Sequence, residues 1–253
     1  EVMVEKGSMN VNQSTWKKTV EFDEVLNPDN TERYFLFTGG RGGGKSHDVA
    51  EAVIKATFET GIGVLFARYY ATSVSTSLSP VLMASAERLG LSKHFTLTND
   101  KIVNNSTGSF ILLMGLHESG GTSSGKKSIG GINMVVLEEA EDLDGGVQWS
   151  RFDKLDDSIR SVLKQNRICL VLNPKNRNGE VYKNFIEHNF EVESFHGYPV
   201  EICNRTDVKH IHQTFHHILP YLDSGWLAKE QRAKIKAELT LLQGIGSCQK
   251  KKC

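Results

Sequence analysis

One eight-residue stretch, Gly39-Gly40-Arg41-Gly42-Gly43-Gly44-Lys45-Ser46, constrains the fold of this 253-residue chain more than any other feature. It fits the pattern G-x-x-x-x-G-K-[ST] of a phosphate-binding loop. Residues 34–38 before it form an apolar run typical of a buried strand, and residues 48–54 after it are typical of a helix. A strand, a loop and a helix in this order are the context that the motif requires, so the pattern predicts an α/β fold built around the loop.

The residue types of this loop suit the binding of a nucleoside triphosphate. The glycines let the backbone adopt positive φ and approach phosphates without a Cβ in the way. Successive N–H groups then form an anion site at a helix N-terminus. We expect Lys45 to contact the β- and γ-phosphates of ATP and the Ser46 hydroxyl to coordinate Mg²⁺. The alternative is a glycine-rich turn that binds nothing, which the entropic cost of ordering so many glycines disfavours.

Composition narrows the class of protein. Lys+Arg and Asp+Glu both number 30, so any contact with nucleic acid must come from a local basic patch and not from the overall charge. The four cysteines show no C-x-x-C pair and no zinc spacing, which favours a reduced, cytosolic protein. No apolar run approaches 18 residues and the start lacks a signal-peptide stretch, so we expect no contact with a membrane.

A second chemical signal lies about 90 residues after the loop, where the apolar residues 132–137 end in Glu138 and Glu139. An apolar strand that ends in two carboxylates is what a Walker B element requires. We assign Glu138 to the Mg²⁺ shell and Glu139 to the general base that polarises the attacking water. Neighbouring side chains of a strand point to opposite faces, so only a twisted strand end can bring both acids near the metal. The alternative is an ordinary acidic turn after a strand.

Between these two signals the chain reads as further strands and helices. Residues 63–68 form an apolar run ending in Arg68, at the strand end where doubly wound sheets gather functional groups. A run over 80–89 that opens with proline is typical of a helix. Turns at 99–100 and 105–108 separate short strand-like runs and predict an antiparallel excursion beside a parallel core.

The glycine-rich run over 118–131 is typical of a mobile loop. Its Lys126 and Lys127 make it either a solvated linker or a loop that touches a phosphate backbone. Beyond the acids, helical spacing predicts an amphipathic core helix over 149–163. The apolar residues with this spacing are Trp149, Phe152, Leu155, Ile159 and Val162.

The last third of the chain begins with another strand-like run at 168–172, which ends in Asn173. An asparagine at this strand tip could sense the γ-phosphate. Residues 180–187 read as a short helix, and 195–203 and 210–219 as strands, followed by a capped helix and a tail. Four histidines alternate here as in a strand, and no cysteine or carboxylate completes a set, so we expect no metal site among them. They are His210, His212, His216 and His217.

Taken together, these pieces resemble the ATPase domain of the large terminase subunit of tailed bacteriophages, over residues from about 33 to 190. The phosphate loop with its Arg41 is similar to that of the family, as is the stretch Phe66-Ala67-Arg68. Glu138-Glu139-Ala140 and Asn173-Pro174-Lys175-Asn176 resemble its Walker B element and its coupling motif, and this combination is more specific than the loop alone.

The resemblance implies a P-loop NTPase of the ASCE type, with a mostly parallel central sheet flanked by helices and a small C-terminal lid subdomain. We expect an N-terminal segment at 1–30, the ATPase core at 31–178, and the lid and tail at 179–253. Arg41 would contact the phosphates in cis, and Asn173 would link hydrolysis to movement. The RNase H-like nuclease domain of the family would follow the lid, so we expect it to have been truncated or to lie on a separate chain.

The expected activity is Mg-dependent hydrolysis of ATP that drives double-stranded DNA into a procapsid. The partners implied are the portal protein, the small terminase subunit and further copies of the chain in a ring, expected to be a pentamer, in the host cytoplasm. Alternatives are a helicase or another nucleic-acid-remodelling ATPase, and a regulatory module that hydrolyses ATP poorly. Four arginines are candidates for the residue that would act on a neighbouring subunit, and the sequence does not choose among them. They are Arg68, Arg151, Arg160 and Arg177.

Overall fold

The computed structural model describes residues 24–70, 78–117, 130–174, 177–214 and 229. The chain divides into two compact units, residues 1–217 and 218–253, and the second contains a single described residue, Lys229. All structural statements below concern the first unit. Within the described ranges, no helix is long and apolar enough to cross a membrane.

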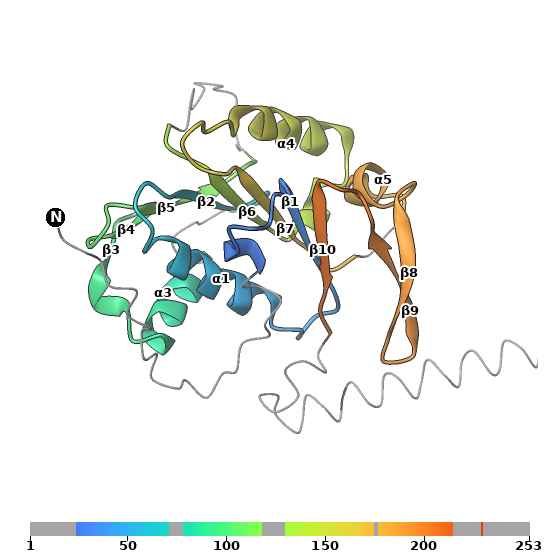
Figure 1. The fold of residues 1–253 in the computed structure, drawn as a ribbon, viewed down its shortest axis with the longest axis horizontal. Coiled ribbons are helices and arrows are strands. Elements are labelled where there is room, and N and C mark those ends of the chain that lie inside the picture. Colours follow the sequence, from blue (N-terminus) through green and yellow to red (C-terminus); the bar gives the residue numbers. More distant parts are fainter. Residues whose placement is uncertain (1–23, 71–77, 118–129, 175–176, 215–228, 230–253) are drawn as a thin grey trace, which may run out of the picture. The chain divides into compact units, whose positions relative to one another are not determined.

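An eight-stranded sheet forms the centre of the first unit (Figure 1). Its strands are β1 (Tyr34–Thr38), β2 (Gly63–Arg68), β3 (Phe95–Leu97), β4 (Lys101–Asn104), β5 (Phe110–Gly115), β6 (Met134–Glu138), β7 (Arg167–Val171) and β10 (Val208–His212). They lie in the order β10-β1-β7-β6-β2-β5-β4-β3. The strands from β10 to β5 are parallel, and β4 and β3 continue the sheet antiparallel, which confirms the expected excursion.

Helices cover both faces of this sheet (Figure 1). Helices α1 (Lys45–Ala56) and α3 (Ser79–Arg88) lie on one face, and α4 (Gly146–Ser158) and α5 (Glu180–Phe185) on the other. The remaining elements are the 3₁₀ turns η2 (Ser92–His94) and η3 (Ala140–Leu143) and a separate two-stranded hairpin of β8 (Phe190–Phe195) and β9 (Tyr198–Cys203).

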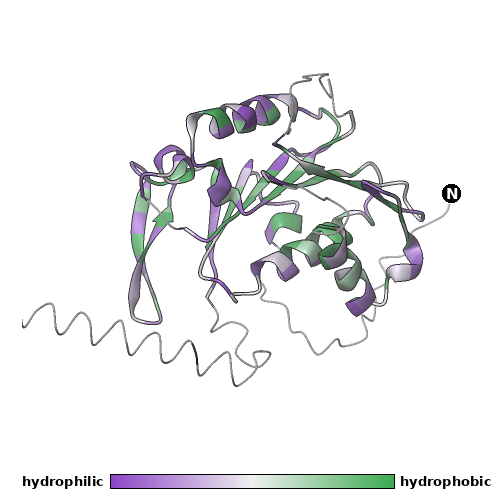
Figure 2. Cartoon of the chain, turned by 180° about the vertical axis from the view of Figure 1, so that it is seen from behind, coloured by the Kyte–Doolittle hydropathy of each residue, from purple (hydrophilic) through white to green (hydrophobic). Residues whose placement is uncertain are grey.

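The central strands β1, β2, β6 and β7 read as nearly continuous apolar runs because the sheet is buried on both sides there. In β1, Phe35 and Phe37 pack into the core beneath α1 and α3, whereas Leu36 packs into the core beneath α4 and α5. Figure 2 shows the apolar residues gathered along these central strands. Because the central strands are parallel, their carboxyl ends meet at the same edge of the sheet.

Strand β10 falls within the residues expected to form the lid, yet it pairs in parallel with β1, with Thr38 opposite His212. Residues 208–212 therefore belong to the main sheet, and the division of the chain at residue 178 stays a prediction. Strand β8 was not expected from the sequence, although Phe190-Glu191-Val192-Glu193 alternates between apolar and polar residues; all its residues are exposed except for the half-buried Phe195.

The helix expected over 149–163 ends earlier, at Ser158. Phe152, Leu155 and Ile159 are buried, but Val162 is 95 % exposed, so its expected place in the core was wrong. Ile159 already has φ −87° and ψ 92°, and helical spacing does not apply beyond it. The loop with Lys126 and Lys127, His216, His217 and the helix expected at the C-terminal end lie outside the described residues.

Candidate nucleotide-binding site

The phosphate loop connects Thr38, the last residue of β1, to Lys45, the first residue of α1. Gly42 and Gly44 have φ of 74° and 83°, in the left-handed region that glycine adopts without strain. Gly44 caps α1 and, as a glycine, has no side chain that could bond to the first N–H groups of the helix. The start of a helix is its positive end, where an anion can bind to N–H groups that have no acceptor within the helix.

The start of the loop is held by the residue that follows β10. The Gln213 N–H donates to the Thr38 carbonyl at 2.8 Å. A Cβ on Gly39 would lie 1.7 Å from the Gln213 carbonyl oxygen, so no other residue type fits there without a shift of the backbone. Gln213 Nε2 also donates to Asp48 Oδ2 of α1 at 2.8 Å, which places Gln213 against both flanks of the loop.

Lys45 is buried, with 7 % of its surface exposed, and its ammonium lies inside the loop. Nζ donates to the carbonyls of Gly39 and Gly40 at 2.9 and 2.8 Å, and to Asn173 Oδ1 at 3.0 Å. Burial lowers the pKa of Lys45 to about 8, and the negative charge of Glu141 opposes this shift.

Asn173 lies just beyond β7 and joins the lysine to an acid. Its N–H donates to Glu141 Oε2 at 3.1 Å, and its Nδ2 donates to Glu141 Oε1 at 3.3 Å. Because the amide nitrogen faces the carboxylate, the amide oxygen faces Lys45. Strand β7 lies between β1 and β6, and this order brings its tip between the loop and the acids.

The two acids at the end of β6 have different environments. Glu138 is 1 % exposed, and its Oε2 accepts from Arg68 Nε at 3.1 Å and Nη2 at 2.7 Å. Glu139 is 53 % exposed, and its Oε1 lies 3.9 Å from Arg68 Nη1. Glu139 has φ 53°, a left-handed conformation that non-glycine residues adopt rarely and that is often found at functional sites.

A cleft of about 500 Å³ brings many of the expected site residues together. It is lined by Arg41, Gly42, Gly43, Gly44, Lys45, Ser46, His47, Glu139, Glu141, Asp142, Val171, Leu172 and Asn173. Of the expected residues, Gly39, Gly40 and Glu138 do not line it. The functional roles assigned to all of these residues stay predictions.

Comparison with known proteins identifies the family. Residues 31–239 match the family described as phage terminase large subunit. The chain belongs to this family. A search of curated proteins found no match.

Solved structures of a large terminase from a thermophilic bacteriophage share the fold. One has a TM-score of 0.62 at 10 % identity and covers 86 % of this chain and 50 % of that chain. The same protein in complex with ATP-gamma-S has a TM-score of 0.58 at 11 % identity and covers 85 % of this chain and 49 % of that chain. This terminase chain therefore spans about half the length of the thermophilic phage protein, and its fold is that of the ATPase domain, a P-loop NTPase of the ASCE type.

Two acids of this terminase cleft were missed in assigning roles from the sequence. Glu141 and Asp142 follow Glu139 in η3 and line the cleft. The available signal was the acidic run from 138 to 142, but sequence alone does not tell which of its carboxylates face the loop. Glu141, which touches Asn173, has the closer connection to Lys45.

Several arginines of this chain, and Tyr34, are bonded to acidic side chains of the same chain. Arg33 and Tyr34 both bond to Asp156 and lie at the end of β1 opposite the loop. Among the arginines considered for a neighbouring subunit, Arg68 is paired with Glu138, and Arg177 with Glu201 at 2.6 Å.

The oxygen donors of this site suit Mg²⁺. No group of three or more His, Cys, Asp or Glu side chains is arranged to hold a metal ion within the described residues. Mg²⁺ is commonly bound by one or two protein groups together with substrate phosphates, so a site of this kind needs few protein ligands. Glu138 Oε1 is buried and has no hydrogen-bond partner among the described residues, and the half-buried Ser46 lines the cleft, so both fit the expected metal shell.

Proposed function

We propose that this terminase chain hydrolyses ATP with Mg²⁺ and uses the free energy to move double-stranded DNA into a procapsid. One observation carries the proposal: the start of α1, with Lys45 and Ser46, faces Glu139 and Asn173 across a single cleft. A cationic loop at a helix N-terminus recognises the triphosphate, and the opposing carboxylate supplies a base for hydrolysis. The large terminase of the thermophilic bacteriophage, solved in complex with ATP-gamma-S and with ADP, supports the choice of nucleotide.

In the proposed site, Lys45 exchanges its contacts with the loop carbonyls for the β- and γ-phosphate oxygens. The N–H groups at the start of α1 add donors to the same oxygens. Ser46 and Glu138 would hold Mg²⁺, which neutralises charge on the phosphates when bound. The ion pair with Arg68 engages Oε2 of Glu138 and leaves Oε1 for the metal.

Glu139 serves as the general base in this proposal. Its carboxylate takes a proton from a water molecule whose oxygen forms a bond to the γ-phosphorus, while the bond from that phosphorus to the β–γ bridging oxygen breaks and ADP leaves. Arg41, exposed on the loop, would contact the charge that develops on the γ-phosphate. Asn173 contacts both Lys45 and Glu141, so a change at the phosphates is passed to the segment after β7.

The proposed partners follow from the family. They are double-stranded DNA, the portal of the procapsid, the small terminase subunit and further copies of the chain in a pentameric ring, in the host cytoplasm and transiently at the portal. DNA packaging is favoured over a helicase because the family match covers residues 31–239.

The experiment is to measure phosphate release from ATP with and without Mg²⁺, with and without double-stranded DNA, and with procapsids that carry a portal. We expect Mg-dependent turnover that procapsids and DNA stimulate and that Lys45→Ala abolishes. If Lys45→Ala matches the wild type, the site is assigned wrongly. Unwinding of duplex DNA in the absence of a capsid would instead favour a helicase.

A further inference from the structure

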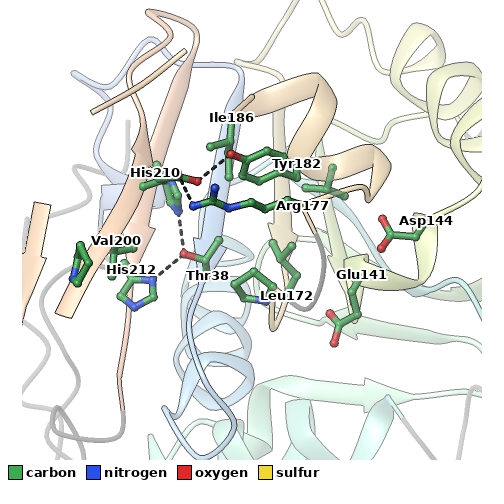
Figure 3. A pocket seen from close by; sticks show the side chains of 14 residues that line it. Thr38, Glu141, Asp144, Leu172, Arg177, Tyr182, Ile186, Val200, His210 and His212 are labelled. Atoms are coloured by element: carbon green, nitrogen blue, oxygen red, sulfur yellow. Dashed lines mark hydrogen bonds and ion pairs between the residues drawn. The ribbon is translucent and has the colours of Figure 1, made fainter. Parts of the chain in front are cut away.

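A series of hydrogen bonds connects the β8–β9 hairpin to the residue that precedes the phosphate loop. The N–H of Cys203, the last residue of β9, donates to His210 Nδ1 at 2.8 Å. His210 Nε2 lies 2.7 Å from Thr38 Oγ1, and Thr38 Oγ1 lies 2.9 Å from His212 Nδ1. Figure 3 shows Thr38 between the two histidines, which lie on the same face of β10.

The main-chain donor at one end fixes the tautomer of His210. A peptide N–H only donates, so His210 Nδ1 must carry a lone pair. Burial lowers the pKa of His210 to about 3, with His212 adding to the shift, so the ring is neutral and Nε2 carries its proton. His210 Nε2–H therefore donates to Thr38 Oγ1, and the tautomer of His212 sets the direction of the hydrogen bond between Thr38 Oγ1 and His212 Nδ1. The hydroxyl at position 38 accepts from His210 and bonds to His212 as well, which a side chain without a polar atom cannot do.

Through Thr38 the series reaches the phosphate loop directly. Thr38 is the last residue of β1, and Gly39 of the loop follows it. Gln213 directly follows β10. Its carbonyl packs against Gly39, and its side chain bonds to Asp48 of α1. A displacement of β10 therefore changes the contacts on both sides of the loop.

The hairpin is anchored along its length, and near its turn the ring of Phe195 packs edge-on against His212, with ring centroids 4.9 Å apart. Cys203 Sγ donates to the Phe185 carbonyl at 3.0 Å, and Glu201 accepts from Arg177 Nη2 and from the Tyr182 hydroxyl. Val192, opposite Glu201, and Tyr198, next to the turn, are exposed. Between the hairpin, α5 and β10 lies a pocket of about 360 Å³ that Thr38, His210 and His212 help to line (Figure 3). A two-stranded hairpin has little stability of its own, so these anchoring contacts determine its position.

We propose that Thr38, His210 and His212 are positioning residues that couple the β8–β9 hairpin to the phosphate loop, so that the position of the hairpin and the binding of nucleotide influence each other. The proposal rests on the proposed function only in requiring that the loop binds nucleotide. Coupling between two sites is reciprocal: if the hairpin affects the loop, nucleotide must affect the hairpin by the same factor.

The test compares Thr38→Val, which keeps the shape and removes the hydroxyl, with Thr38→Ser, which keeps the hydroxyl. Affinity for a fluorescent ATP-γ-S derivative is measured together with hydrogen exchange of the backbone amides of residues 198–203, which include the Cys203 donor. In the wild type and in Thr38→Ser, nucleotide slows exchange at Cys203. In Thr38→Val, affinity falls by at least about fivefold and nucleotide no longer changes the exchange.

Two results would overturn the proposal. In one, Thr38→Val keeps wild-type affinity and wild-type protection of Cys203. In the other, Thr38→Ser loses as much nucleotide affinity and as much protection of Cys203 as Thr38→Val does. The effect would then come from the shape of the side chain and not from its hydroxyl. If Thr38→Val does not fold, His212→Asn and His212→Leu form a second pair, because Asn keeps an acceptor near the position of Nδ1 and Leu removes it. Equal behaviour of this pair also overturns the proposal.

The outcome separates this proposal from the proposed function. If the wild type does not bind nucleotide, the proposed function fails. If the wild type binds nucleotide and all four variants bind it equally well, only the coupling through Thr38 fails.

Discussion

Lys45 Nζ donates to Asn173 Oδ1 at 3.0 Å, although 128 positions separate the two residues in the chain. The contact exists because β7 lies next to β1 in the sheet, so that the ends of the two strands meet at the same edge. Asn173 also bonds to Glu141, which places one amide between the buried cation and an acid of the cleft. This arrangement suggests that Asn173 is needed for turnover more than for binding.

Replacement of Asn173 by alanine should therefore lower kcat more than it weakens nucleotide affinity. We expect a loss of about tenfold or more in kcat, because Lys45 and Glu141 each lose a hydrogen bond, with less than about threefold change in affinity. Steady-state ATPase kinetics and equilibrium binding of ATP-γ-S measure the two quantities. Asn189→Ala, at an exposed asparagine, is the control. Equal losses in affinity and kcat would assign Asn173 a role in binding alone.

The buried ammonium of Lys45 should make stability depend on pH. Its pKa of about 8 in the folded chain lies below the 10.5 of an exposed lysine. Between these values the unfolded chain holds more protons at this position than the folded chain does, so stability rises as the pH increases through this window. We expect the unfolding free energy of the nucleotide-free wild type to gain about 2 kcal/mol over that of Lys45→Met between pH 7.5 and 10. Urea unfolding of both proteins measures this difference, and parallel curves would contradict it.

The contact between Gly39 and Gln213 predicts that alanine lowers stability more at Gly39 than at the neighbouring Gly40. Alanine at Gly39 would place its Cβ 1.7 Å from the Gln213 carbonyl oxygen at φ 145°, whereas alanine at Gly40 meets nothing within 4 Å. We expect Gly39→Ala to lower stability by about 2–4 kcal/mol and Gly40→Ala to change it by less than about 1 kcal/mol. Thermal unfolding without nucleotide measures both. Equal effects would show that β10 does not hold the loop.

The pair of Arg68 and Glu138 should behave as one unit. Arg68→Gln leaves the buried Glu138 carboxylate without its partner, which we expect to cost about 3 kcal/mol of stability. The double variant Arg68→Gln/Glu138→Gln should recover much of this loss, because the unpaired charge is then gone. Urea unfolding of the four proteins completes the double-mutant cycle. Additive effects would show that Arg68 and Glu138 do not stabilise each other, and Arg68 would then be a candidate for contact with a neighbouring subunit.

Local chemistry explains which features were predictable from the sequence. The phosphate loop follows from its own glycines, lysine and serine, and β6 from an apolar run that ends in two acids. The helix at 149–163 was predicted too long because apolar spacing continues to Val162 after the backbone has left the helix at Ile159. Strand β8 was not predicted although Phe190-Glu191-Val192-Glu193 alternates as in a strand, and its apolar residues Phe190 and Val192 are exposed.

Long-range pairing explains what the sequence left open. Nothing near His210 indicates that β10 pairs with β1 or that Thr38 lies between two histidines, because these contacts depend on the order of strands in the sheet. The relation of Glu141 to Asn173 depends likewise on the position of β7. The expected residues could be listed from motifs, but the contacts that hold them come from the topology.

The most direct test of the proposed hydrolysis is to measure ATP turnover and ATP-γ-S binding by Glu139→Gln, with the exposed Glu87→Gln of α3 as the control. The substitution removes the base but keeps the size of the side chain and its position on the cleft. We predict a loss of turnover of at least about a hundredfold, with affinity within about threefold of the wild type and a control that behaves as wild type. Wild-type turnover by Glu139→Gln would contradict the assignment of Glu139 as the base.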